Sequence, residues 1–174
     1  MSSAERKEPN PSVGRYVSTP FPPYSFIPGQ NPHPRNDPKG HSHGKPEPTA
    51  TYTPKEQWKK NEPWLFGVDL YNFGYWWESH EQWEALWKLP QNNEQEKLFY
   101  RAMIQLAAAN IKRFCERIEG AQSLARQSVE KLRALEGELF MGVALAPLIQ
   151  EIELYHVLER SSHIPRLELK EKEG

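Results

Sequence analysis

The chain has 174 residues, enough for one domain with a hydrophobic core and too few for two domains of ordinary size. Its 22 basic and 23 acidic residues nearly cancel, so no overall charge favours nucleic acid, an anionic membrane or a polyanionic substrate. The single cysteine excludes a disulfide framework, and no apolar run approaches the ~20 residues that a membrane span requires. The first residues lack the apolar stretch of a signal peptide. We therefore expect a soluble, cytoplasmic protein with no nucleic-acid or membrane partner.

Proline dominates the first 50 residues, which contain eleven of the 16 prolines. Because proline fixes φ and lacks an N–H donor, regular helices and central strands do not fit there. Residues 1–18 are polar and are predicted to be disordered. Residues 19–52 are predicted to form an extended Pro/His-rich arm that packs on the folded body. The apolar side chains that would hold it are Phe21, Tyr24, Phe26 and Ile27.

The body, residues 53–160, is predicted to be all-helical because apolar residues recur at helical spacing and strand-like alternation is absent. Thr53, followed by a proline and by Glu56, predicts a capping box at the start of a short first helix. A second short helix would begin near Pro63 and end at Gly74 in the left-handed conformation.

The later helices follow the same signals. A tryptophan-rich helix is predicted over residues 75–88, and Asn93 with Glu96 predicts a second capping box at the start of the longest helix, which would extend to about Ile118. Two more helices are predicted over residues 121–135 and from Pro147 to about Leu158, and the charged tail 161–174 is expected to fray. The prediction is a compact all-α bundle of five or six helices.

The tryptophan-rich helix carries the most informative polar residues. Helical spacing puts Trp76, His80, Trp83 and Trp87 on one side, and Trp77, Glu81, Glu84 and Lys88 on the neighbouring side. Because partly buried acids need partners, we expect the imidazole and the acids to point inward to one enclosed site. The hypothesis follows that the apolar anchors of the arm bring three of its polar residues to that site: His33, Asp37 and His41.

The sequence HExxE that begins at His80 differs in its last residue from the zinc-binding motif HExxH. In a metal site, His80 and Glu84 would be ligands and Glu81 the general base, with another ligand supplied from elsewhere. Glu153 and His156 have the ExxH spacing of dimetal carboxylate bundles and are further candidate ligands, although such bundles carry this spacing twice.

The sequence leaves three functions open. The leading hypothesis is a binding or interaction module, with a pocket or dimer interface lined by Glu, His and Trp that would also suit a small-molecule ligand. The second is a metal-dependent hydrolase that uses the HExxE helix, and the third is a purely structural protein. No cofactor is predicted apart from the divalent metal that the hydrolase would require.

The six tryptophans lie between residues 58 and 87, more indole surface than a small core easily buries. Exposed aromatic area is typical of interfaces, so self-association into a homodimer is expected. The alternative is that the N-terminal arm covers these rings.

Three segments, WWESHEQWEALW, IQLAAANIK and EGAQSLARQSVEKL, occur in this order over about residues 62–157. Together they resemble the domain of unknown function 309 family. The resemblance implies a compact α-helical bundle and supplies no reaction. It points to six residues as the binding positions to examine: Glu78, His80, Glu81, Glu84, Trp87 and Gln105.

Overall fold

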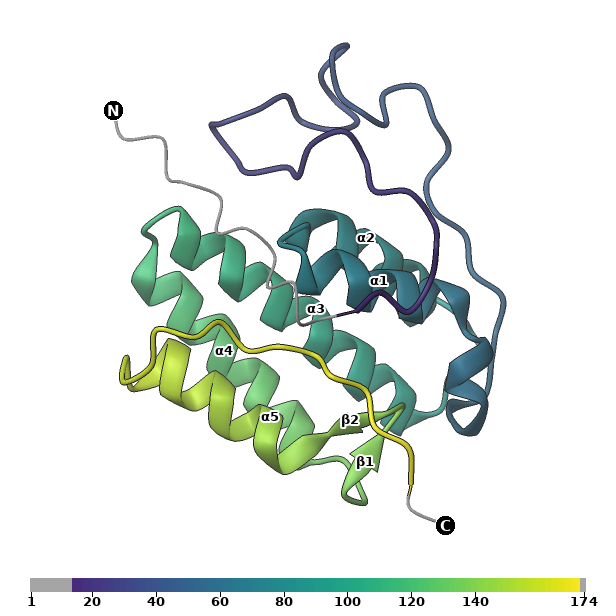
Figure 1. Ribbon diagram of the computed structural model, residues 1–174, viewed down its shortest axis with the longest axis vertical. Helices are drawn as coiled ribbons and strands as arrows, with labels where there is room; N and C mark the ends of the chain where they lie inside the picture. Colours follow the sequence, from purple (N-terminus) through teal and green to yellow (C-terminus); the bar gives the residue numbers. More distant parts are fainter. Residues whose placement is uncertain (1–13, 173–174) are drawn as a thin grey trace.

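The computed structural model describes residues 14–172 and is built mainly of α-helices (Figure 1). In this part of the chain the elements are η1 (a 3-10 helix, Lys55–Lys60), α1 (Glu62–Asn72), α2 (Trp76–Trp87), α3 (Glu94–Phe114), α4 (Ile118–Arg133), β1 (Leu139–Phe140), β2 (Val143–Ala144), α5 (Leu145–Ile152) and η2 (a π-helical turn, Glu153–Val157). The predicted all-α bundle of five or six helices is confirmed. Within the described residues, no helix is both long and apolar enough to cross a bilayer.

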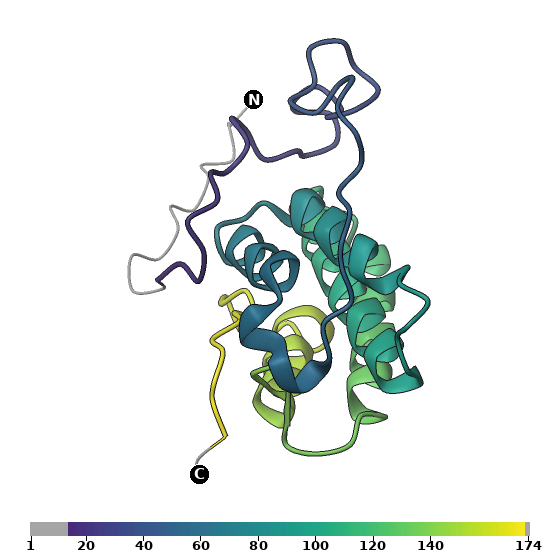
Figure 2. The same ribbon diagram turned by 90° about the vertical axis from the view of Figure 1, so that its right-hand side faces the viewer.

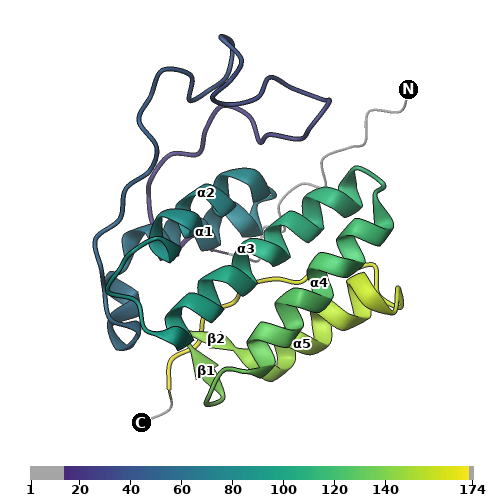
Figure 3. The same cartoon turned by 180° about the vertical axis from the view of Figure 1, so that it is seen from behind.

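Helix α3 lies in the middle of the bundle, between α2 and α4 (Figures 1 and 3). Helix α1 packs on α2, and α5 with η2 packs on α4. Three aromatic side chains join the first three helices. The ring centroid of Trp64 on α1 lies 5.5 Å from that of Trp83 on α2 and 5.0 Å from that of Phe99 on α3. All three are fully buried, so this cluster fixes how α1, α2 and α3 sit together.

The predicted helix ends are partly confirmed. Asn93 and Glu96 form the reciprocal capping box at the start of α3, and Gly74 adopts a φ of 82° after α1. The capping box predicted at Thr53 is wrong, because the N-cap residue of η1 is Pro54, which has no side-chain acceptor. The predicted end of the longest helix is also wrong. The chain leaves α3 after Phe114, and Ile118 belongs to α4.

The C-terminal region differs from the sequence prediction in two ways. A two-stranded hairpin, in which Phe140 pairs with Val143, lies between the last two predicted helices; its strands are too short to show alternation. The segment predicted to fray packs on α1. Leu167 is buried, its N–H donates to Asn72 Oδ1 at 3.0 Å, and the Tyr71 hydroxyl donates to the Pro165 carbonyl at 2.7 Å. Apolar burial and these bonds hold the segment in place; residues 173–174 lie outside the described part.

Residues 14–54 contain no helix or strand and pass around α1 and α2 (Figures 1 and 2). We call residues 14–45 the strap and residues 46–53 the hinge. The strap runs along one side of α1 and loops beyond α2, and the hinge returns on the other side to η1 (Figure 2). The disorder predicted for residues 1–18 is wrong for residues 14–18, because the Tyr16 and Val17 N–H groups donate to Asp69 on α1. Residues 1–13 lie outside the described part of the chain.

The close approach of α2 to α1 depends on Gly67. A Cβ atom built at Gly67 would overlap the Trp83 indole, whereas one at Gly120 on α4 would meet the Lys112 side chain at 3.5 Å, an ordinary contact. We predict that Gly67→Ala lowers the free energy of unfolding by about 2 kcal/mol or more, because the buried indole cannot move away. Gly120→Ala should change it by less than about 1 kcal/mol. Urea unfolding of both variants tests this, and equal effects would contradict it.

Candidate functional site

A buried carboxylate on α1 holds the beginning of the strap. Asp69 is 0% exposed, and its Oδ1 and Oδ2 accept the N–H groups of Tyr16 at 2.8 Å and Val17 at 3.0 Å. The Arg15 guanidinium adds an ion pair, with Nε 3.4 Å from Oδ2. Two backbone donors and one cation therefore satisfy an acid that water does not reach.

A second buried carboxylate, on α2, holds the middle of the strap. Glu78 is 4% exposed, and its Oε1 and Oε2 lie 3.3 and 3.0 Å from the Phe26 backbone nitrogen. His41 Nε2 lies 2.8 Å from Oε2, and His41 Nδ1 lies 2.8 Å from the Ser42 hydroxyl. Burial raises the pKa of Glu78 above its usual value, while the bonds from His41 and Phe26 oppose that rise. Glu78 is thus bound in the same way as Asp69. In both cases a strap backbone N–H group and a strap side chain, His41 or Arg15, contact one buried carboxylate.

A third acid, Glu81, holds the loop of the strap. Arg35 donates to both of its oxygens, from Nε at 2.5 Å and from Nη2 at 3.0 Å. The same guanidinium donates from Nη1 to the Lys45 carbonyl at 3.0 Å, which closes the loop. A bidentate Arg–carboxylate pair fixes orientation as well as distance.

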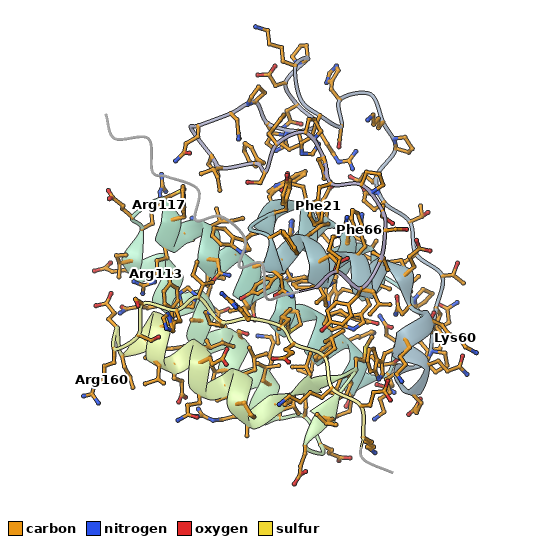
Figure 4. All side chains as sticks on the ribbon, viewed as in Figure 1. Phe21, Lys60, Phe66, Arg113, Arg117 and Arg160 are labelled. Carbon is orange, nitrogen blue, oxygen red and sulfur yellow. The ribbon has the colours of Figure 1, made fainter. Side chains whose placement is uncertain are left out.

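Aromatic contacts lie between these polar ones. The Phe21 ring lies 4.9 Å from the ring of Tyr75 and 5.2 Å from that of Phe73, and Phe66 is next to it (Figure 4). The Trp77 ring makes edge contacts with three strap rings: Phe26 at 5.7 Å, His33 at 5.5 Å and His41 at 6.4 Å. We call the surface formed by six α1–α2 residues the docking face: Phe66, Asp69, Phe73, Trp77, Glu78 and Glu81.

The strap and the helices beneath it have opposite charge. Residues 14–45 contain four Lys and Arg side chains against one acidic residue, whereas residues 62–87 contain five acidic residues and no Lys or Arg. Charge complementarity of this kind favours docking and disfavours wrong partners.

His80 and Glu84 do not point into an enclosed site, so that prediction is wrong. They form an i, i+4 pair at 3.3 Å whose side chains are 30% and 37% exposed, and Lys88 lies 3.8 Å from Glu84. Their rotation about α2 puts them at the rim, whereas Glu78 and Glu81 face the strap. Of the arm residues predicted to approach them, His33 and His41 contact Trp77 instead.

The remaining predicted residues lie outside the docking face. Asp37 Oδ1 accepts the Lys39 N–H within the strap loop. The Trp87 ring lies under the Arg101 guanidinium, 5.4 Å from it. Gln105 Nε2 donates to Gln127 Oε1 at 3.0 Å between α3 and α4.

The candidate metal ligands are separated. His156 Nδ1 accepts from Arg113 Nε at 3.2 Å, and its Nε2 lies 2.7 Å from Asn110 Oδ1. Arg113 lies away from Phe21 and Phe66 (Figure 4). Glu153 pairs with Arg133. In residues 14–172 no group of three or more His, Cys, Asp or Glu side chains has a metal-binding arrangement. These contacts do not join His80 and Glu84 with Glu153 and His156 in a common site.

The family model described as "Domain of unknown function (DUF309)" matches residues 64–124. Residues 64–124 are a DUF309 domain. The predicted resemblance is thus confirmed for this part of residues 62–157. No curated protein matches the chain.

The docking face lies wholly within the DUF309 domain, and the strap lies outside it. Sequence reasoning missed three charged residues of this contact: Arg15, Arg35 and Asp69. A signal for Asp69 was available, because it is the one charged residue in the otherwise apolar run from Trp64 to Tyr71. A charged residue at a helical position that must be buried requires a partner.

His156 makes the stability of the protein depend on pH. Burial and the nearby Arg113 lower the pKa of His156 to about 4, so the imidazole is neutral in the folded state. The unfolded chain takes up this proton near pH 6.5, so the stabilisation is complete above pH 6.5 and is lost as the pH falls towards 4. We predict that this residue alone lowers the free energy of unfolding by roughly 3 kcal/mol over that range.

Urea unfolding between pH 7 and pH 4 measures this effect. His156→Gln removes the titrating group, so the variant should show a correspondingly smaller decrease over the same range. Parallel curves for wild type and variant would contradict the assignment.

Proposed function

We propose that the protein is a peptide-binding interaction module, and that its docking face recognises an extended basic segment. The strap is the occupant within the chain itself. The observation that carries the proposal is the pair of buried acids, Asp69 and Glu78, each bonded to strap backbone N–H groups. The two carboxylates accept backbone N–H groups, which every extended peptide offers. Side-chain contacts then determine which peptide sequences bind.

Selectivity would come from three strap residues. Arg35 satisfies Glu81 in a bidentate pair, His41 bonds to Glu78, and the Phe21 ring packs against that of Phe73. Each charge-assisted bond contributes on the order of 1.5–3 kcal/mol in general, and aromatic contacts add to this. Together they support recognition of a basic, aromatic segment rather than of any peptide.

The metal-dependent hydrolase receives less support from the geometry. Its candidate base, Glu81, has both oxygens bonded by Arg35, and its candidate ligands, His80 and Glu84, lie at the rim beside Lys88. A cytoplasmic location belongs to the same proposal and is supported by the lone cysteine, Cys115, which leaves no disulfide to be formed within the chain.

A trans-binding experiment tests the module. In full-length Arg35→Ala/His41→Ala, the strap loses its side-chain bonds to Glu78 and Glu81 and keeps only the Phe26 backbone bond to Glu78. The docking face should then accept a fluorescent peptide of residues 21–45. We predict at least about tenfold tighter binding to this variant than to wild type, whose own strap competes at high effective concentration. Fluorescence anisotropy measures the affinity.

Two controls make the result specific. A Lys39→Ala variant, altered at an exposed strap residue, should bind the peptide as wild type does. Adding Glu78→Gln and Glu81→Gln to the first variant should remove binding. If no variant binds the peptide, the strap is a structural cover and the purely structural alternative holds.

A further inference from the structure

The C-terminal segment lies on the bundle as an extended run in which alternate residues face inward. We call residues 163–172 the clasp; it crosses the bundle from the end of α5 towards the hairpin (Figure 1). Leu167 is buried, and Leu169 packs against the hydrophobic core. The three residues that alternate with them are exposed: Arg166, Glu168 and Lys170. A two-residue period of this kind is that of extended chain with one buried face, so the clasp is a docked segment.

Hydrogen bonds fix the clasp on two parts of the body. On α1, Asn72 Oδ1 accepts the Leu167 N–H at 3.0 Å, and Asn72 Nδ2 donates to the Leu167 carbonyl at 2.8 Å. In the hairpin, the Gly142 carbonyl accepts the Lys170 N–H at 2.7 Å. Because these bonds lie on both sides of Leu169 in the chain, the backbone of Leu169 is held in a definite position.

Leu169 contacts the strap directly. Its N–H donates to the Tyr16 hydroxyl at 2.8 Å, although the two residues are 153 positions apart in the chain. The Tyr16 N–H in turn donates to Asp69 Oδ1 at 2.8 Å. Tyr16 is thus held at its backbone by α1 and at its side chain by the clasp.

Helix α1 brings the two extended segments together. Asp69, which binds the strap, and Asn72, which binds the clasp, are three positions apart, so their side chains are neighbours on the helix. Each side chain makes two hydrogen bonds to the backbone of the segment that it holds. The first anchor of the strap and the anchor of the clasp therefore lie within one helical turn, with Tyr16 joining them.

We propose that the clasp controls the opening of the strap. While the clasp is docked, the Leu169 N–H holds Tyr16 and slows the separation of the strap from Asp69. Coupling between two segments is reciprocal, so the docked strap also stabilises the clasp. Release of the clasp then loosens the first anchor of the strap and leaves the second anchor, at Glu78, in place. The inference concerns the strap docked in its own chain, so it holds whether or not the docking face binds another peptide.

Removal of one hydroxyl tests the coupling in the full-length protein. Tyr16→Phe keeps the ring and the backbone bond to Asp69 but takes the acceptor away from the Leu169 N–H. Amide hydrogen exchange followed by NMR should show that the Leu169 and Val17 amides exchange at least about threefold faster than in wild type. Tyr24→Phe is the matched control. It removes a strap hydroxyl that donates to the Pro32 carbonyl, away from the clasp, and should leave both rates unchanged.

A substitution in the clasp tests the same coupling from the other side. Leu167→Ala removes buried apolar contacts of the clasp and leaves every strap residue intact. The Val17 amide should again exchange faster, whereas the Phe26 amide, which donates to Glu78, should keep its wild-type rate. In Tyr16→Phe/Leu167→Ala the increase at Val17 should be smaller than the product of the two single increases, because both substitutions break one contact. Circular dichroism should show the helix content of wild type in each variant.

Four results would overturn the inference. The first is a Val17 amide that exchanges at the wild-type rate in Tyr16→Phe, and the second is an equal acceleration in Tyr24→Phe. The third is a multiplicative effect in the double variant, which means that strap and clasp open independently. The fourth is an acceleration at Phe26 as large as that at Val17, because the substitutions then destabilise the whole strap instead of its first anchor.

Discussion

The structure depends on the hydrogen bonds to two carboxylates that lie on the helical bundle and are buried beneath the strap. Transferring an ionised acid out of water costs several kcal/mol unless hydrogen bonds replace the lost hydration. Asp69 and Glu78 meet this requirement with backbone N–H groups of Tyr16, Val17 and Phe26. The acids therefore impose a definite path on a proline-rich segment that forms no helix or strand of its own.

The same contacts explain how a segment without secondary structure can be placed reproducibly. Extended chain gains nothing from helical hydrogen bonds, so its conformational entropy must be offset by contacts with the body. Acids and aromatic rings alternate along the docking face, and the strap presents amides, guanidinium groups and rings in a matching order. Polar contacts set the register, and the buried Phe26 and Ile27 contribute apolar area.

Features with a local physical signal were predictable from the sequence. The capping box at Asn93 and the left-handed Gly74 depend on neighbouring residues, and the core tryptophans follow helical spacing. Which polar side chains of α2 are buried and which are exposed was not predictable in the same way. Helical spacing gives the angle between Glu78 and His80, but which side is buried depends on the strap, whose path leaves no periodic pattern in the sequence.

The C-terminal segment illustrates the same limit. Its charge composition predicted fraying, yet Leu167 is buried and exchanges hydrogen bonds with Asn72. Burial of a single extended segment depends on the surface it meets, which is formed by α1, almost a hundred positions earlier in the chain. The DUF309 domain thus meets two extended segments that lie outside the family match, and the docking face is where one of them is bound through buried acids.

Amide hydrogen exchange of the strap tests the central claim most directly. The amides of Tyr16, Val17 and Phe26 should exchange at least about a hundredfold more slowly than hinge amides such as Thr51, because each donates to a buried carboxylate. Glu78→Ala should remove protection at Phe26 while Tyr16 and Val17 stay protected, and Asp69→Ala should do the reverse. Strap amides that exchange as fast as the hinge in the wild-type protein would contradict the account.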